Sequence, residues 1–177
     1  SLHDALPISA TYDVQQRSVP FLDTVVSIDG ENYIQTNVYK KPTDRCQYLM
    51  PSSARPGHIT KNIPYSLAYR LKRICSKPEW FEKALKELGM DLLKRQYHPK
   101  VINSAFKRVS NVSRGEALVK VSKQKSQREA MVLTYYPELP SITNIIQKHW
   151  YVMKETDPEL QRCFNQPSMV AYKRTKN

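Results

Sequence analysis

Proline constrains this sequence more than any other residue, because it limits how far a helix or a central strand can run. The 177 residues include twelve prolines and only four glycines. Proline lacks the N–H that a helix interior or a sheet ladder needs, but it fits the first helical turn. Pro64, Pro78 and Pro99 each introduce an apolar repeat of helical spacing. The sequence therefore predicts three short helices that begin at these prolines.

The first of these helices is expected over 64–76, after a brief helix around 58–62. One of its faces is apolar and carries Leu67, Leu71 and Ile74. A different face is cationic and carries Arg70, Arg73 and Lys77. This helix therefore offers one side to a hydrophobic core and another side to a negatively charged partner.

The second helix is expected to follow a capping-box pattern, Ser76 to Glu79, and to end near Arg95. The third helix is expected over 99–109, with His98 placed to cap its first turn. Tight turns between consecutive helices predict a small bundle. The helix pair around Pro78 is typical of a helix-turn-helix.

Strands are expected on both sides of this bundle. The stretches 18–28 and 33–39 are rich in β-branched and aromatic residues and flank the turn signal Asp29–Asn32, which predicts a β-hairpin. Farther along, a buried strand is expected over 130–136, and a short strand is expected over 169–172. The expected fold class is α+β and mainly α, with an N-terminal hairpin, a helix-turn-helix-like bundle and a small α/β segment.

Two helices are expected between the last two strands. The first contains Ile142, Ile145, Ile146 and Trp150 at helical spacing, with His149 as a satisfied core residue on the same face. The second is a short helix over 158–164.

The positive charge is concentrated in the middle of the chain. The net formal charge is +12, and residues 55–128 alone carry eighteen Lys/Arg against five Asp/Glu. Such an excess indicates a polyanionic partner, and nucleic acid fits better than a membrane because no lipid-anchoring amphipathic helix accompanies it. No apolar run approaches the 18 residues of a membrane span.

Several basic residues are candidates for contacting that polyanion. Arg70 and Arg73 share a helix face one turn apart, about 5 Å along the axis, within reach of neighbouring backbone phosphates. His58 follows Gly57 near a helix start and is a candidate phosphate contact. The basic residues that bracket the helix in sequence are Lys40, Lys41, Arg55, Lys61, Lys94 and Arg95.

The sequence lacks the patterns of common catalytic and metal sites. No two aspartates are adjacent, and there is neither a Gly-x-Ser-x-Gly turn nor a glycine-rich phosphate loop. Cys46, Cys75 and Cys163 lack zinc-ligand spacing. Asp23 lies in an apolar stretch and is expected to bond nearby backbone. We expect no catalytic residue, metal site, cofactor or small-molecule substrate in this chain.

Two blocks of the sequence resemble the reverse transcriptases of Penelope-like retroelements. Pro20–Asp23 and Val38–Thr43 are similar to the "FLD … VYRKPT" region that follows the palm strands in that family. Residues 55–76 are similar to its "HPxHxxKxIPY … RxxRICS" block, with Arg55 in place of the usual His. Arg95–Tyr97 resembles its "RGY" step, with Gln96 in place of Gly, and 133–137 its strand after the thumb.

The resemblance covers roughly residues 19–177 and implies an RNA-directed DNA polymerase of a mobile element, often followed by a GIY-YIG endonuclease. It implies that 10–44 is the end of the palm with the primer-grip hairpin, 45–128 a helical thumb, and 129–177 a linker toward the endonuclease. Residues 1–9 resemble a translated sequencing adapter and are expected to be a non-native leader. The chain contains neither the Tyr-x-Asp-Asp palm acids nor the GIY-YIG motif.

The resemblance also assigns roles to individual residues. Phe21, Leu22 and Asp23, with Lys40 and Lys41, would position the primer terminus. The residues that would follow the backbone of the template–primer duplex are Arg70, Lys72 and Arg73. The parent protein would use Mg²⁺ and act inside the cell, in the nucleus.

Two other functions remain open at this stage. One is a free-standing helix-turn-helix module that reads DNA sequence in the major groove. The other is a protein-interaction scaffold whose basic face binds an acidic partner. The first differs from a reverse-transcriptase fragment in requiring one preferred DNA sequence, and the second in preferring a protein.

Overall fold

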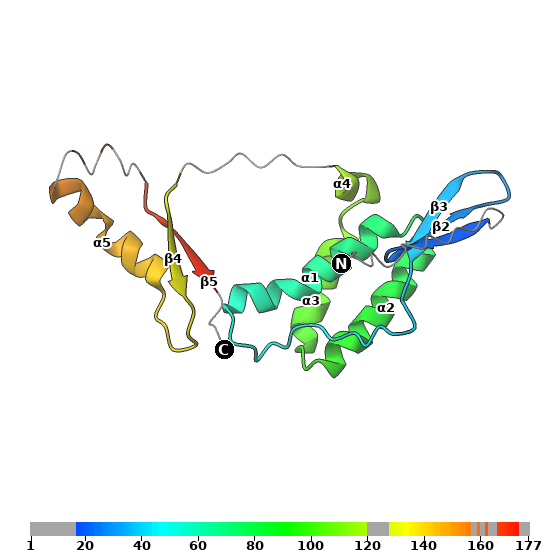
Figure 1. The fold of residues 1–177 in the computed structure, drawn as a ribbon, viewed down its shortest axis with the longest axis horizontal. Helices are drawn as coiled ribbons and strands as arrows, with labels where there is room; N and C mark the ends of the chain where they lie inside the picture. Colours follow the sequence, from blue (N-terminus) through cyan, green and yellow to red (C-terminus); the bar gives the residue numbers. More distant parts are fainter. Residues whose placement is uncertain (1–16, 120–127, 157–158, 160–161, 163–165, 174–177) are drawn as a thin grey trace, which may run out of the picture.

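The fold is α+β, as the sequence predicts (Figure 1). The computed structural model describes residues 17–119, 128–156, 159, 162 and 166–173. The expected leader over 1–9 lies outside these residues, as does most of the short helix expected over 158–164. In chain order the elements are β1 (Ser18–Phe21), β2 (Thr24–Ile28), β3 (Ile34–Val38), α1 (Gly57–Ile74), α2 (Pro78–Lys94), α3 (Pro99–Ser110), α4 (Arg114–Leu118), β4 (Ala130–Thr134), α5 (Ile142–Thr156) and β5 (Met169–Lys173).

The N-terminal sheet has three antiparallel strands in the order β1-β2-β3. The expected hairpin is present as β2 and β3, and the carboxylate of Asp29 accepts the N–H groups of Glu31 and Tyr33 in its turn at 2.9 Å each. The hydrogen bond from Tyr33 holds the pKa of Asp29 below its usual value. The prediction of one continuous strand over 18–28 was wrong. Leu22 adopts φ 57° and folds β1 back onto β2, so that Phe21 pairs with Thr24.

Helix α1 also corrects a prediction, since it is one helix of 18 residues that passes through Pro64. The sequence places a break there because proline removes the hydrogen bond to the carbonyl four residues earlier. The pyrrolidine ring is fully buried, and it continues a buried stripe that begins at Thr60 and ends at Ala68. Packing of this stripe into the core offsets the missing bond.

Helices α1, α2 and α3 surround one hydrophobic core. Helix α1 packs against both of the other two and most extensively against α3. The core is a cluster of eight buried residues: Ala68, Cys75, Phe81, Leu88, Leu92, Tyr97, Ile102 and Val109. The extended segment before α1 is fixed to the bundle by two hydrogen bonds, from Arg95 Nε to the Tyr48 carbonyl at 2.7 Å and from the Tyr97 hydroxyl to the Leu49 carbonyl at 2.8 Å.

The corner between α1 and α2 is bound to the sheet, and this overturns the predicted capping box. The Ser76 side chain does not cap α2. Instead, Thr36 N–H donates to Ser76 Oγ at 2.7 Å, and Ser76 N–H donates to the Thr36 carbonyl at 2.9 Å. The Thr36 hydroxyl donates to the Ile74 carbonyl at 2.5 Å. Lys77 is the residue before α2, and it makes no side-chain capping bond.

Beyond α4, the strands β4 and β5 pair in parallel and are connected through α5, which makes a β-α-β unit. The short strand expected near 169–172 is confirmed. The prediction of a buried β4 was wrong, because among the described residues β4 pairs with β5 alone and leaves Met131 and Val132 exposed. His149 is exposed as well, so its predicted place in a core was also wrong.

The turn between α2 and α3 is built on a residue in the left-handed region. Gln96 has φ 65° and follows Arg95, the C-cap residue of α2. Its N–H bonds the Leu93 carbonyl at 2.9 Å, and the Tyr97 N–H bonds the Leu92 carbonyl at 3.1 Å. These two bonds make a Schellman motif, in which glycine is the preferred residue at the left-handed position. His98 then caps α3, as predicted, by accepting the Lys100 N–H at 3.1 Å.

Replacing Gln96 with glycine should therefore raise the free energy of unfolding by about 1 kcal/mol, because glycine adopts positive φ without a steric cost. Urea denaturation followed by circular dichroism measures the change. Gln96→Ala is the matched control, since alanine removes the side chain but keeps the Cβ. An equal gain from both variants would show that the side chain, and not the backbone angle, limits stability at this turn.

Candidate nucleic-acid interface

Acidic and basic residues are divided unequally among the three core helices. Helices α1 and α3 contain no aspartate or glutamate. Their basic residues are Lys61, Arg70, Lys72, Arg73, Lys100, Lys107 and Arg108. The acids of the bundle's three core helices all lie on α2, at Glu79, Glu82, Glu87 and Asp91. The surfaces of α1 and α3 therefore combine positive charge with no opposing charge of their own.

A basic groove runs between α1 and α3. It encloses about 290 Å³ and is lined by Lys61, Tyr65, Lys100, Val101, Ser104, Ala105 and Arg108. The lining follows helical spacing on both sides, since Lys61 and Tyr65 are four residues apart on α1 and Lys100, Ser104 and Arg108 are each four apart on α3. Three cations thus meet in one groove without an acidic side chain in its wall.

The aromatic side of the groove is already occupied by one of these cations. The Arg108 guanidinium lies 4.3 Å from the centre of the Tyr65 ring. Tyr65 also stacks on Tyr69, with ring centres 5.8 Å apart. A guanidinium over an aromatic ring can still donate its N–H groups to other partners.

Three predicted contacts lie together at the N-terminal end of α1. Arg55, His58 and Lys61 are all exposed, and only Lys61 also lines the groove. The first turn of α1 contains no acidic residue, so the positive end of the helix dipole adds to their charge.

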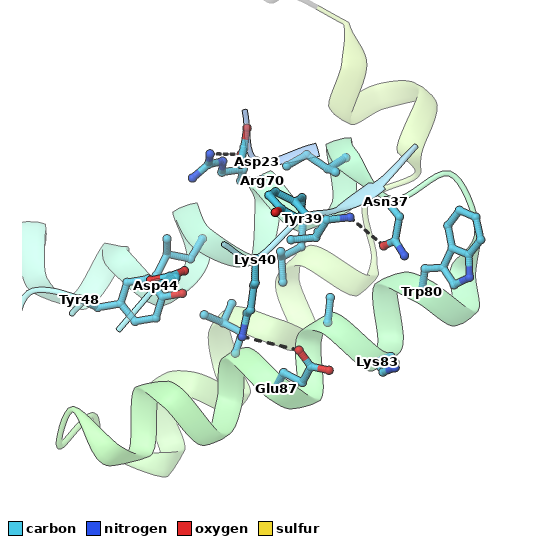
Figure 2. A pocket seen from close by; sticks show the side chains of 16 residues that line it. Asp23, Asn37, Tyr39, Lys40, Asp44, Tyr48, Arg70, Trp80, Lys83 and Glu87 are labelled. Atoms are coloured by element: carbon cyan, nitrogen blue, oxygen red, sulfur yellow. Dashed lines mark hydrogen bonds and ion pairs between the residues drawn. The ribbon is translucent and has the colours of Figure 1, made fainter. Parts of the chain in front are cut away.

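The two arginines predicted to bind phosphate on the C-terminal half of α1 differ in their contacts. Arg70 forms an ion pair with Asp23, which projects from the β1–β2 turn (Figure 2). The prediction that Asp23 bonds nearby backbone was wrong, because its carboxylate pairs with the Arg70 side chain instead. Arg73 is exposed and forms no ion pair with any described residue. Of the two arginines, Arg73 is the more available to an external anion.

Three other predicted cations are engaged within the protein. The Lys72 ammonium lies 4.5 Å from the centre of the Phe81 ring, and Arg95 bonds the Tyr48 carbonyl. Lys40 donates to Asp91 at 3.1 Å and lies 3.6 Å from Glu87. Burial acts to lower the pKa of Lys40, but the hydrogen bond to Asp91 and the attraction of the Asp91 and Glu87 carboxylates together outweigh it and raise the pKa. Binding of nucleic acid by these three residues stays a prediction, and a phosphate would have to compete with these contacts.

The remaining predicted residues are exposed. Lys41 follows β3 and Lys94 ends α2. Phe21 and Leu22, predicted by resemblance to contact a primer, are 66% and 70% exposed at the β1–β2 turn. This turn lies beside a cavity of about 410 Å³ between β3, α1 and α2, where Asp23 and Arg70 contribute to the wall together with Lys40 and Glu87 (Figure 2).

Sequence reasoning missed the groove residues Lys100 and Arg108 as candidate contacts. The signal that could have identified them is the absence of acids from both 57–74 and 99–110, combined with the rows of residues four apart.

Among the described residues, no group of three or more His, Cys, Asp or Glu side chains is arranged to hold a metal ion. Within the same residues, every helix is too short or too polar to cross a membrane.

Comparison with known proteins identifies the class of the central region. Residues 47–107 match the family described as the animal helix-turn-helix domain. This range covers the segment before α1, all of α1 and α2, and most of α3. A helix-turn-helix region implies nucleic-acid binding. No curated protein and no solved structure matches the chain.

Replacing Asp23 with asparagine should tighten nucleic-acid binding by roughly two- to fivefold. An exposed ion pair of this kind is worth up to about 1 kcal/mol, and its loss frees Arg70 for phosphate. Fluorescence anisotropy with a labelled duplex measures the change. Glu31→Gln, in the β2–β3 turn, alters the net charge by the same amount away from α1. If both variants tighten binding equally, the affinity for the duplex depends on net charge and not on the ion pair between Asp23 and Arg70.

Proposed function

We propose that this chain binds the sugar–phosphate backbone of a nucleic-acid duplex, as the primer-grip and thumb fragment of a mobile-element reverse transcriptase. One observation carries the binding proposal: α1 and α3 are rich in basic residues and contain no acid. Cations without internal partners attract phosphates and release counterions when they bind them, so such surfaces bind nucleic acid in a salt-dependent way.

The reverse-transcriptase origin rests on the resemblance of two sequence blocks, and the fold supports it in one respect. The first block contributes Asp23 and the second contributes Arg70, and these two side chains meet. The exposed turn of Phe21 and Leu22 therefore lies next to the basic helix that would follow the duplex. A primer terminus at this turn and its duplex along α1 would be contacted by one continuous surface.

In this proposal the chain binds the duplex but does not extend the primer. The sequence has no adjacent aspartates to hold catalytic metals, and the parent polymerase would supply them along with Mg²⁺. The fragment would act inside the cell, in the nucleus, where the element is copied.

The double variant Arg70→Ala/Arg73→Ala should lower affinity for an RNA–DNA duplex at least tenfold at physiological salt. Each lost phosphate contact removes roughly 0.9 from the slope of log affinity against log salt, so the slope should become shallower by about 2. Anisotropy titrations between 50 and 200 mM salt, the range over which such contacts weaken strongly, measure both quantities.

Lys83→Ala/Lys86→Ala is the matched control, because it removes two positive charges from the acid-bearing helix α2. This control should change the affinity little and leave the salt slope as it is. An unchanged duplex affinity in the Arg70/Arg73 variant would contradict the proposal.

A second candidate function is a free-standing helix-turn-helix module that reads a DNA sequence. The match over 47–107 favours it, because this range includes α2 and most of α3 as a second consecutive helix pair. Helix α3 presents Asn103 on its exposed side, where the side chain could reach base edges.

Competition distinguishes the two candidates. A backbone-binding fragment should be displaced equally by unlabelled duplexes of unrelated sequence, and RNA–DNA hybrid should compete at least as well as DNA. A sequence-reading module should instead select one DNA sequence from a randomised pool, typically by a factor of about 10³ or more over the others. Enrichment of a single motif would favour the module and count against the fragment.

A further inference from the structure

We propose that the groove between α1 and α3 is a phosphodiester-binding subsite that holds the backbone of one nucleic-acid strand. This inference rests on the proposed function, but it assigns the contact to residues that are distinct from Arg70 and Arg73. The subsite consists of Lys61 from α1 and Lys100, Ser104 and Arg108 from α3.

The electrostatics of the groove call for an anion. Lys61, Lys100 and Arg108 line one space of about 290 Å³, and none of them forms an ion pair with a described residue. Like charges brought together repel each other, and the effect is stronger beside a low-dielectric wall than in open water. The apolar part of that wall comes from Val101 and Ala105. A phosphate bound among the three cations would turn this repulsion into attraction.

The geometry favours the backbone over the bases. A base would bind by stacking on an open aromatic face, but Arg108 lies against the Tyr65 ring and Tyr69 stacks with it. The stack fixes the guanidinium of Arg108, whose planar fork of N–H donors matches two oxygens of a phosphate. Ser104 adds a neutral hydroxyl donor between the two cations of α3.

Lys61 in the subsite and Arg73 are too far apart to hold the same phosphate. Lys61 and Arg73 are twelve residues apart on α1, which corresponds to about 18 Å along a helix axis. Substitutions at such a distance have nearly additive effects when both sites contact the ligand. The groove should therefore contribute to affinity independently of the predicted arginines.

The test compares Lys100→Ala with Lys107→Ala. Both remove one positive charge from α3, but only Lys100 lines the groove. We expect Lys100→Ala to lower duplex affinity about three- to tenfold and to reduce the salt slope by about 1, equally for two duplexes of unrelated sequence. Lys107→Ala should leave the slope unchanged. Thermal unfolding of each variant verifies that the chain is folded at the assay temperature.

Arg108→Lys provides a second and independent variant, because lysine keeps the charge but lacks the planar fork. We expect its duplex affinity to fall about threefold or more at an unchanged net charge. Combining Lys100→Ala with Arg70→Ala/Arg73→Ala should give the sum of the separate free-energy changes.

Each outcome separates this inference from the proposed function. Equal effects of Lys100→Ala and Lys107→Ala would overturn the subsite, and so would full affinity in both Lys100→Ala and Arg108→Lys. If the Arg70/Arg73 variant still loses affinity in that case, duplex binding stands without the groove. A labelled phosphopeptide that binds more tightly than the duplex, and weakens in Lys100→Ala, would overturn the assignment to nucleic acid.

Discussion

The contact between β3 and the corner of α1 and α2 determines how the sheet and the helices are joined. Thr36 and Ser76 exchange two hydrogen bonds through the main chain of Thr36, and the Thr36 hydroxyl satisfies the carbonyl of Ile74 at the end of α1. A helix end leaves carbonyls without intrahelical partners, so the sheet here supplies what water or a cap would otherwise provide. With this corner fixed, the β1–β2 turn brings Asp23 to Arg70, and the end of β3 brings Lys40 to the acids of α2.

These three ion pairs decide which cations remain available to a partner. Lys40, just after β3, pairs with Glu87 and Asp91. Asp23, in the β1–β2 turn, pairs with Arg70 and partly neutralises its charge. None of these ion pairs involves a residue of the groove between α1 and α3 or the exposed Arg73. Exposed ion pairs are weak in water and weaken further with salt, so a phosphate can displace Asp23 at little cost. In the proposed function, masking of this kind would lower the affinity of α1 for the duplex without abolishing it.

The sequence predicted the helices well because their prolines and apolar repeats are local signals, and α2 and α3 begin at Pro78 and Pro99 as expected. It failed where distant contacts override a local signal. Pro64 was read as a helix start, but core packing carries α1 through it. Ser76 was read as a helix cap, but it bonds a strand that lies far from it in sequence. The groove was missed for the same reason, because its two walls come from α1 and α3, which pack together but have the whole of α2 between them in the sequence.

The two readings of the chain depend on different rows of α3. Lys100, Ser104 and Arg108 form the row that faces the groove shared with α1, and a nucleic-acid strand held there would be recognised by its charge and shape. Asn103 lines an apolar groove with α2 instead, and Lys107 is exposed. A helix that inserts into the major groove must present its base-reading side chains clear of neighbouring helices. Because its strongest cluster of charge faces α1, the basic surface of α3 is better suited to holding a backbone than to reading a sequence.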